Sequence, residues 1–292
     1  LRIDLKNKLV TPTLKNAHLH LGETFFRPLN GHWTLEKYLK YTEGYNKKHE
    51  KNIDFIWEKS ASATINESIK FGVGTICTIR GHHILGNYKL KSLSGYPIMK
   101  SNKLKKFIDY GIDGYKEFYN HCKRNQIVPG IFIHSLYCNN IDSLNFVKKC
   151  LGQGSDFIAI HVAETEQSEK SVQKIWHNKR SIEILLENGL LNKNTLLVHC
   201  GHLLPYELEL IAKYNAKIVL CPVSNTKLST KTIDPAVFDD YKIKWCLATD
   251  GLATGETANM LYHAQHLKQL FPNLSDQEIL KSVTMYASVC LN

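Results

Sequence analysis

Two histidines stand one residue apart in the segment KNAHLHLGE, residues 15–23, directly after an apolar run. If that run is a β-strand, His18 and His20 point to the same face, because side chains on a strand alternate with a period of two residues. Imidazole nitrogen is a good ligand for Zn²⁺ and related ions. The pair therefore predicts half of a metal site, which a third histidine and a carboxylate would complete with room for water.

Short apolar runs alternate along the chain with longer stretches of helical period, a pattern typical of repeated βα units and a parallel sheet. Eight runs are found, at residues 8–20, 72–79, 93–100, 127–135, 156–164, 194–202, 216–224 and 243–251. Eight such units form a (β/α)8 barrel of the TIM type in about 250 residues. We therefore expect residues 1–292 to be a single catalytic barrel, with two helices in the long segment 32–72. A doubly wound sheet is the weaker alternative, because no G-x-G-x-x-G follows the first run.

Polar residues stand at the ends of five of these runs, where barrel enzymes keep their catalytic groups. In chain order they are His18 and His20, His134, His161 with Glu164, His199 with His202, and Asp250. His161 and Asp250 are the natural candidates to complete the ligand set, because imidazole and carboxylate are both ligands of Zn²⁺. An isolated H-x-H is more often structural, and it is the convergence of several strand ends that favours a metal site here.

The composition, with 43% apolar residues, is that of a globular protein, and no apolar stretch approaches the roughly 18 residues of a membrane span. The 8 cysteines are scattered without a C-x-x-C pair. This usage indicates buried thiols in a reducing compartment and favours a cytoplasmic protein. The net charge of +10 is spread along the chain, which favours a solvated basic surface over a nucleic-acid site. We expect a small-molecule substrate, no nucleic-acid or membrane partner, and leave a homo-oligomer open.

Five segments together carry a family resemblance: LVTPTLKNAHLHLGE, IHVAETEQSE, LLVHCGH, CPVSNTKL and LATDGLATGE. Their residues and their order resemble the amidohydrolase superfamily over residues 3–291, and in particular its branch of chlorohydrolases and adenosine-type deaminases. The H-x-A-E-T, V-H-C and P-x-S-N-x-K-L elements make the assignment to this branch specific. The resemblance implies a metal-dependent barrel hydrolase that acts on carbon–nitrogen bonds other than peptide bonds.

The resemblance also implies a ligand set. In this branch one divalent metal ion, usually zinc or iron, is bound by the residues that match His18, His20, His161 and Asp250. We expect zinc, with iron as the alternative. A second ion is not expected, because related two-metal enzymes carry a bridging lysine on the fourth strand and residues 127–135 contain no lysine.

Residues that match Glu164 and His199 take part in the chemistry of this branch. A metal-bound water has a pKa near 7, and Asp250, as ligand and base, can accept its proton as it attacks an amine-bearing ring carbon. Glu164 lies three residues beyond His161 and can protonate a ring nitrogen, then carry a proton to the departing ammonia. Its alternative role is that of a carboxylate at a helix N-terminus. His199 would orient the attacking oxygen or polarise the carbon.

Two further residues are expected at the substrate. His134 matches a substrate-contacting histidine in a P-H-A-P-Y motif of the deaminases, although Ser135 and Leu136 replace its Ala-Pro pair. Asn225 is expected to contact the substrate or to hold the turn after the seventh run. His202 is expected to be structural rather than a ligand. The replacements at Ser135 and Leu136 do not affect the predicted metal ligands, but they leave the identity of the substrate undecided.

The predicted function is hydrolytic deamination of a heteroaromatic amine, such as S-adenosylhomocysteine, methylthioadenosine or aminodeoxyfutalosine. The alternatives are guanine deamination, triazine-type chlorohydrolysis, cyclic amide hydrolysis and a non-catalytic metal-binding barrel. Glu164 argues against the last, because a site that only binds has no use for a proton shuttle. The family's small β-sandwich, built from both chain ends, is expected to be absent from these residues or to lie outside them.

Overall fold

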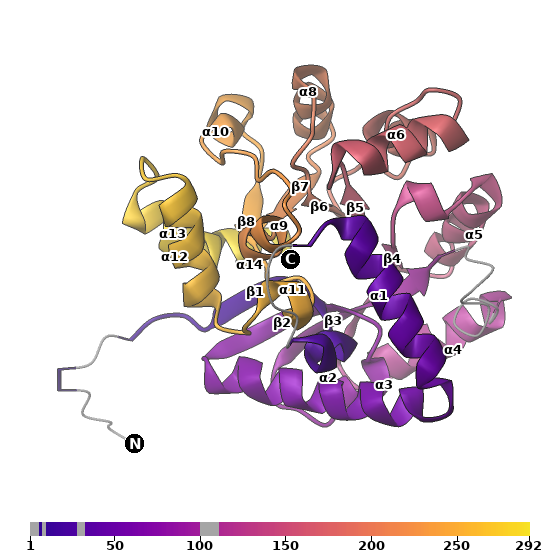
Figure 1. The fold of residues 1–292 in the computed structure, drawn as a ribbon, viewed down its shortest axis with the longest axis horizontal. Coiled ribbons are helices and arrows are strands. Elements are labelled where there is room, and N and C mark those ends of the chain that lie inside the picture. Colours follow the sequence, from indigo (N-terminus) through magenta and orange to yellow (C-terminus); the bar gives the residue numbers. More distant parts are fainter. Residues whose placement is uncertain (1–5, 8–9, 28–32, 100–110) are drawn as a thin grey trace.

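A computed structural model gives the fold of the chain and describes residues 6–7, 10–27, 33–99 and 111–292. In this part of the chain an eight-stranded sheet has the order β1 to β8, and neighbouring strands are parallel. Figure 1 shows the strands around a common centre, with helices such as α2, α4, α5 and α12 outside them. The predicted (β/α)8 barrel is confirmed.

The strands coincide with the eight predicted runs. They are β1 Leu14–His20, β2 Val73–Ile79, β3 Lys91–Ile98, β4 Val128–Ile133, β5 Phe157–Val162, β6 Thr195–His199, β7 Lys217–Leu220 and β8 Trp245–Leu247. From β3 onward the strands end earlier than predicted, so that His134, Glu164 and Asp250 lie just beyond them. The prediction for β7 overran furthest into a helix, because Pro222 opens that helix where its missing N–H costs no hydrogen bond. Residues 8–9 and residue 100 of the predicted runs lie outside the described residues.

Helices connect the strands, and the two that were expected between the first and second strands are α1 and α2. The described helices are α1 Leu35–Lys48, α2 Ile53–Lys70, α3 His82–Leu85, α4 Gly111–Arg124, α5 Ile141–Leu151, α6 Glu166–Ile175, α7 Ser181–Glu187, α8 Pro205–Lys213, α9 Pro222–Lys227, α10 Val237–Tyr241, α11 Leu252–Gly255, α12 Met260–Leu270, α13 Asp276–Ser282 and α14 Met285–Cys290. Short 3₁₀ helices lie at η1 Leu21–Phe26, η2 Glu50–Asn52 and η4 Leu136–Cys138. None of the helices in the described residues combines the length and the apolar character that a membrane crossing requires.

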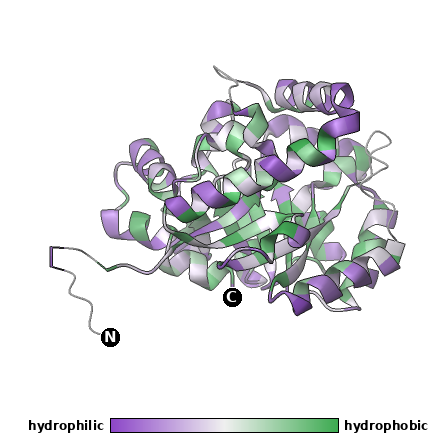
Figure 2. Ribbon diagram, turned by 90° about the horizontal axis from the view of Figure 1, so that it is seen from below, coloured by the Kyte–Doolittle hydropathy of each residue, from purple (hydrophilic) through white to green (hydrophobic). Residues whose placement is uncertain are grey.

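The apolar core has two layers, which alternate along each strand. On β5, Phe157 and Ala159 belong to the cluster inside the barrel, whereas Ile158 and Ile160 belong to the layer between strands and helices. Figure 2 shows mainly hydrophobic strands in the middle of the molecule and helices of mixed character outside them. Because side chains alternate with a period of two residues, His161 follows Ala159 into the barrel interior.

An asparagine joins the two ends of the sheet, β1 and the segment after β8. The fully buried Asn16 accepts a hydrogen bond from the backbone N–H of Thr249 (3.1 Å) and donates one to its hydroxyl oxygen (2.8 Å). The backbone N–H of Asp250 donates to the carbonyl oxygen of His18 (3.1 Å). This seam therefore brings the first and the last of the predicted metal ligands side by side.

We predict that Asn16→Ala lowers the free energy of unfolding by about 1–3 kcal/mol, because it leaves the buried backbone N–H of Thr249 without its acceptor. The measurement is urea unfolding in excess chelator, so that metal binding makes no contribution. Asn87→Ala is the matched control, since Asn87 is exposed and the change there should stay within about 0.5 kcal/mol. Equal unfolding free energies for the two variants would contradict the role of the seam.

Candidate metal centre and active site

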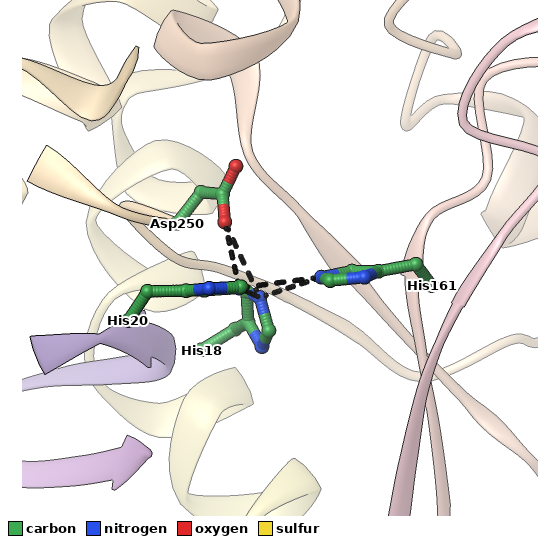
Figure 3. Close-up of side chains that lie close together, drawn as sticks. All are labelled: His18, His20, His161 and Asp250. Atoms are coloured by element: carbon green, nitrogen blue, oxygen red, sulfur yellow. Dashed lines mark hydrogen bonds and ion pairs between the residues drawn. The ribbon is translucent and has the colours of Figure 1, made fainter. Parts of the chain in front are cut away.

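Four predicted ligands converge at the carboxyl end of the barrel. His18 and His20 come from β1, His161 from β5 and Asp250 from the segment after β8, and one ligand atom of each lies within 4.8 Å of all the others (Figure 3). The Nε2 atom of His18 lies 3.0 Å from that of His20 and 3.1 Å from that of His161. The Oδ1 atom of Asp250 lies 3.1 Å from Nε2 of His20 and 3.4 Å from Nε2 of His18.

These distances fit the coordination of a metal ion. Ligand atoms about 2.0–2.2 Å from an ion lie about 3.3 Å from one another in a tetrahedral arrangement. A neutral imidazole has only one N–H, so three Nε2 atoms that face one another cannot all be satisfied by mutual hydrogen bonds. The cluster of His18, His20, His161 and Asp250 thus suggests a single divalent ion, and within the described ranges it is the one group of this kind.

Burial and the neighbouring charges together set the charge states of the ligands. It lowers the pKa of His18 to about 4 and the pKa of His161 well below the usual value, so both rings are neutral at pH 7 and need lose no proton to bind a metal. Burial would by itself raise the pKa of Asp250, but the neighbouring imidazoles, that of His20 first, hold this pKa well below its usual value. Asp250 therefore supplies the negative charge that a divalent cation requires.

Three residues without a predicted role support the ligands. The Phe132 ring is stacked on that of His18, with centroids 5.4 Å apart, and meets the ring of His161 edge-on at 5.1 Å. Ser224 donates a hydrogen bond to Oδ2 of Asp250 (2.7 Å), and the hydroxyl of Thr254 lies 3.4 Å from the same oxygen. Ser224 lies in the CPVSNTKL motif, and this motif is the feature of the sequence that could have indicated its role. Phe132 reads as an ordinary core residue in the sequence.

The backbone takes unusual conformations where the strands end. Ala163, His199, Cys200 and Asp250 all have positive φ angles, between 48° and 72°. Such angles are uncommon outside glycine and cost roughly 1 kcal/mol or more each. Backbone hydrogen bonds offset this cost, because Cys200 N–H donates to Val162 and Asp250 N–H to His18. The turns place Glu164, His199 and Asp250 at one site, although each comes from the end of a different strand.

Glu164 and His199 form a second buried pair next to the ligands. Their Oε1 and Nε2 atoms lie 3.8 Å apart, and the residues are 5% and 1% exposed. Burial raises the pKa of Glu164, and the charges of Asp250 and Glu23 add to this effect, whereas His199 and His20 oppose it. The carboxyl group therefore holds a proton more readily than an exposed glutamate does.

Asn225 fixes the ring of His199. Its Oδ1 atom lies 2.8 Å from Nδ1 of His199, while its amide nitrogen donates to the Thr232 hydroxyl (3.0 Å) and to the Lys231 carbonyl (3.3 Å). With the amide held in this way, Nδ1 of His199 carries the proton and Nε2 faces Glu164. Asn225 is itself fully buried. Its predicted contact with substrate stays a prediction, and its hydrogen bond to His199 indicates a positioning role.

His134 and His202 lie outside the group of four ligands. The ring of His134 meets that of His161 edge-on with centroids 5.0 Å apart, and its Nδ1 atom lies 3.5 Å from Sγ of Cys138. Burial lowers the pKa of His134 to about 3, so the ring is neutral and free to give or accept one hydrogen bond. The backbone N–H of His202 donates to the Ala163 carbonyl (2.9 Å), which agrees with the structural role expected of it.

A barrel of parallel strands with three histidines and one aspartate at its carboxyl end has the architecture of a metal-dependent hydrolase. Residues 143–292, about half of the 292-residue chain, match the model of the amidohydrolase family. The chain belongs to the amidohydrolase family. The predicted family is confirmed, and with it the enzyme class, a hydrolase of carbon–nitrogen bonds other than peptide bonds.

Relatives with assigned names extend over the whole barrel. A 5-methylthioadenosine/S-adenosylhomocysteine deaminase of Pyrococcus furiosus is 26% identical over 298 residues, which cover 97% of this chain and 70% of the relative. The crystal structure of an adenosine deaminase from Xanthomonas campestris with bound zinc has a TM-score of 0.81 at 19% identity, over 96% of this chain and 66% of that one. Guanine deaminase of E. coli has a TM-score of 0.83 at 18% identity, over 96% and 68%. The chain thus spans about two thirds of the length of these relatives.

We predict that the purified chain holds one divalent ion and that His18→Ala loses it, because the variant removes the ligand at the centre of the cluster. Elemental analysis after dialysis against limiting chelator measures the metal content. His83→Ala is the control, since His83 is exposed and lies outside the cluster. Two ions per chain, or full metal content in His18→Ala, would show that the ligand set is wrong.

Proposed function

We propose that residues 1–292 are the single catalytic barrel of a zinc-dependent aminohydrolase, which removes ammonia from a heteroaromatic amine by hydrolysis. The substrate class we propose is an adenine nucleoside or thioether, such as methylthioadenosine or S-adenosylhomocysteine. The observation that carries the proposal is the buried pair of Glu164 and His199 beside the four-ligand cluster. Names of the relatives support the reaction, since the Pyrococcus protein is a 5-methylthioadenosine/S-adenosylhomocysteine deaminase.

In this proposal the ion is held by His18, His20, His161 and Asp250. Three imidazoles and one carboxylate suit Zn²⁺ and leave room for a water, and iron is the alternative. A zinc ion in such a site supplies a hydroxide nucleophile at neutral pH. Zinc is also the metal in the structure of the Xanthomonas adenosine deaminase, which has the same fold.

The protein's own residues then move the protons. Asp250 stays ionised, and its Oδ2 atom is anchored by Ser224, so Oδ1 is oriented toward the ligand cluster and can accept the proton of the attacking water. Glu164, with its raised pKa, protonates a ring nitrogen of the substrate. It then relays the proton that Asp250 took from the water to the amino group, which leaves as ammonia, and it regains its own proton from the hydroxyl group on the ring carbon as the carbonyl forms. His199, fixed by Asn225, orients the attacking oxygen.

The buried carboxyl group also favours an enzyme over a non-catalytic binding protein. Burying an ionisable group costs free energy unless partners satisfy it. The Oε1 atom of Glu164 lies 3.8 Å from Nε2 of His199, beyond normal hydrogen-bond distance. A group kept at this cost beside a metal site is suited to proton transfer, which a site that only binds a ligand does not require.

The proposal also includes the cellular location of the protein and the kind of molecule it binds. We infer a cytoplasmic location, because all eight cysteines are free thiols and seven of them are buried. The partner is a small molecule that enters at the carboxyl end of the barrel, where barrel enzymes keep their catalytic groups. Self-association of the chain is open to measurement by sedimentation.

The experiment that tests the function is a coupled ammonia-release assay with the zinc-loaded protein. The panel contains methylthioadenosine, S-adenosylhomocysteine, adenosine, guanine, an aminotriazine and a cyclic amide. We expect ammonia from the adenine compounds. Turnover of guanine alone would replace the proposed substrate class, and no turnover of any amine by protein with one bound ion would reject the aminohydrolase.

We predict that Glu164→Gln lowers kcat by about 10²-fold to 10⁴-fold, the usual contribution of general acid–base catalysis. The amide keeps the size of the side chain but cannot transfer a proton, so metal content and substrate affinity should persist. Glu166→Gln is the matched control, because Glu166 is an exposed residue two positions further along the chain. Turnover within about threefold of the parent, at equal metal content, would reject the proton shuttle.

We also predict that His134→Ala lowers kcat/KM without loss of metal. His134 lies beside His161 but is not part of the ligand cluster, so its neutral ring is free for a substrate hydroxyl or ring atom. The measurement is steady-state kinetics with the best substrate of the panel, together with metal analysis. Metal loss in this variant would make His134 a ligand instead.

A further inference from the structure

Glu23, in η1, occupies the side of His20 that faces away from the other ligands. Its Oε1 atom lies 3.0 Å from Nδ1 of His20, whereas Nε2 of the same ring faces the ligand cluster. Glu23 is thus not a member of the ligand set itself. It contacts His20 through Nδ1, the ring nitrogen that would not bind the metal ion.

The other oxygen of Glu23 is held by a tyrosine from helix α1. The Tyr38 hydroxyl donates to Oε2 of Glu23 at 2.6 Å. Tyr38 is only 6% exposed and packs in a small apolar cluster with Phe26, Leu228 and Ala253, which come from η1 and from the segments of α9 and α11. Both oxygens of the carboxylate therefore have a partner of their own, and its orientation is fixed.

A glycine makes room for this carboxylate. A Cβ atom built on Gly251 would lie 1.6 Å from Oε2 of Glu23, which is far inside van der Waals contact. Gly251 directly follows Asp250 in the chain. The Glu23 carboxylate therefore packs against the backbone next to this predicted ligand. Glu23 is thus the hydrogen-bond acceptor, Tyr38 is the donor, and Gly251 leaves space for the carboxylate.

We propose that Glu23 is a positioning residue for the metal ligand His20, and that Tyr38 holds Glu23 in turn. A metal-bound histidine that donates its second N–H to a carboxylate has its tautomer and ring orientation fixed and becomes a more basic ligand. Here the bond from Nδ1 of His20 to Glu23 leaves the lone pair of Nε2 for the ion. The inference rests on the metal site proposed above and assigns two residues to it that lie outside the ligand set.

The same contacts connect helix α1 to the metal centre. The backbone N–H of Trp33, just before α1, donates to the Lys227 carbonyl at the end of α9 (2.8 Å). Tyr38, one turn into the helix, then reaches Glu23. A change in the position of α1 would therefore be transmitted to His20 through two hydrogen bonds.

The experiment measures zinc affinity by competition with a chromophoric chelator for the parent and for Glu23→Ala, Glu23→Gln and Tyr38→Phe. We expect Glu23→Ala to bind zinc about tenfold to a hundredfold more weakly, the usual effect of losing such a partner. Glu23→Gln should lose less, because the amide oxygen still accepts from Nδ1 of His20. Tyr38→Phe should show the smallest loss of the three. The absorption spectrum of the Co²⁺-loaded protein should shift in Glu23→Ala, since it reports the ligand geometry.

Two control variants, and a comparison of Glu23→Ala with the parent, distinguish failure of the positioning role from failure of the metal site. Glu36→Gln and Tyr41→Phe change exposed residues of the same helix and should leave the affinity at the parent value. If the parent chain fails to bind one ion, the metal site itself is wrong. If the parent binds one ion and Glu23→Ala binds it equally well with an unchanged Co²⁺ spectrum, the positioning role is overturned. Should Glu23→Ala not fold, the affinities of Glu23→Gln and Tyr38→Phe decide, and parent affinity in both would overturn the proposal.

Discussion

The close approach of three imidazole nitrogens and one carboxylate oxygen is the constraint on which the rest of the structure depends. These atoms lie within 4.8 Å of one another, although the three nitrogens cannot all be paired by hydrogen bonds. The barrel holds them there by closing its seam at Asn16 and Thr249, which sets β1 against the segment that carries Asp250. Phe132, in the barrel interior, packs against the rings of His18 and His161.

The two carboxylates of the site have environments that shift their pKa values in opposite directions. Asp250 is surrounded by imidazoles and anchored by Ser224, and its pKa lies well below the usual value. Glu164 is buried, with its Oε1 atom 3.8 Å from Nε2 of His199, and burial raises its pKa. A pair of groups separated in this way provides a base and an acid at one pH, which is what a reaction that both takes up and releases protons requires.

Several residues of the site contact the predicted ligands and catalytic residues rather than one another. Asn225 holds His199, Ser224 holds Asp250, and Glu23 contacts His20. Each of these contacts fixes which nitrogen or oxygen faces the centre, a property that the ligands do not possess by themselves. The positive φ angles at the strand ends fit this picture, because strained turns are kept where surrounding contacts over-determine them.

The sequence by itself determined the eight strands and the barrel, because these depend on patterns with a fixed period along the chain. The four ligands were predicted from residues at the strand ends and from the family resemblance. The alternation of apolar residues located the strands, and the spacing of His18 and His20 placed both rings on one face. The family resemblance added the roles of Glu164 and His199. The tertiary structure alone decided which side chains meet across strands that are far apart in sequence. Phe132 resembles an ordinary core residue, and Tyr38 an ordinary residue of the helical segment 32–72. Glu23 ends the KNAHLHLGE segment, but the sequence does not show which side chains it contacts. Their contacts with the ligands arise only when closure of the barrel brings η1, α1 and the segment after β8 together.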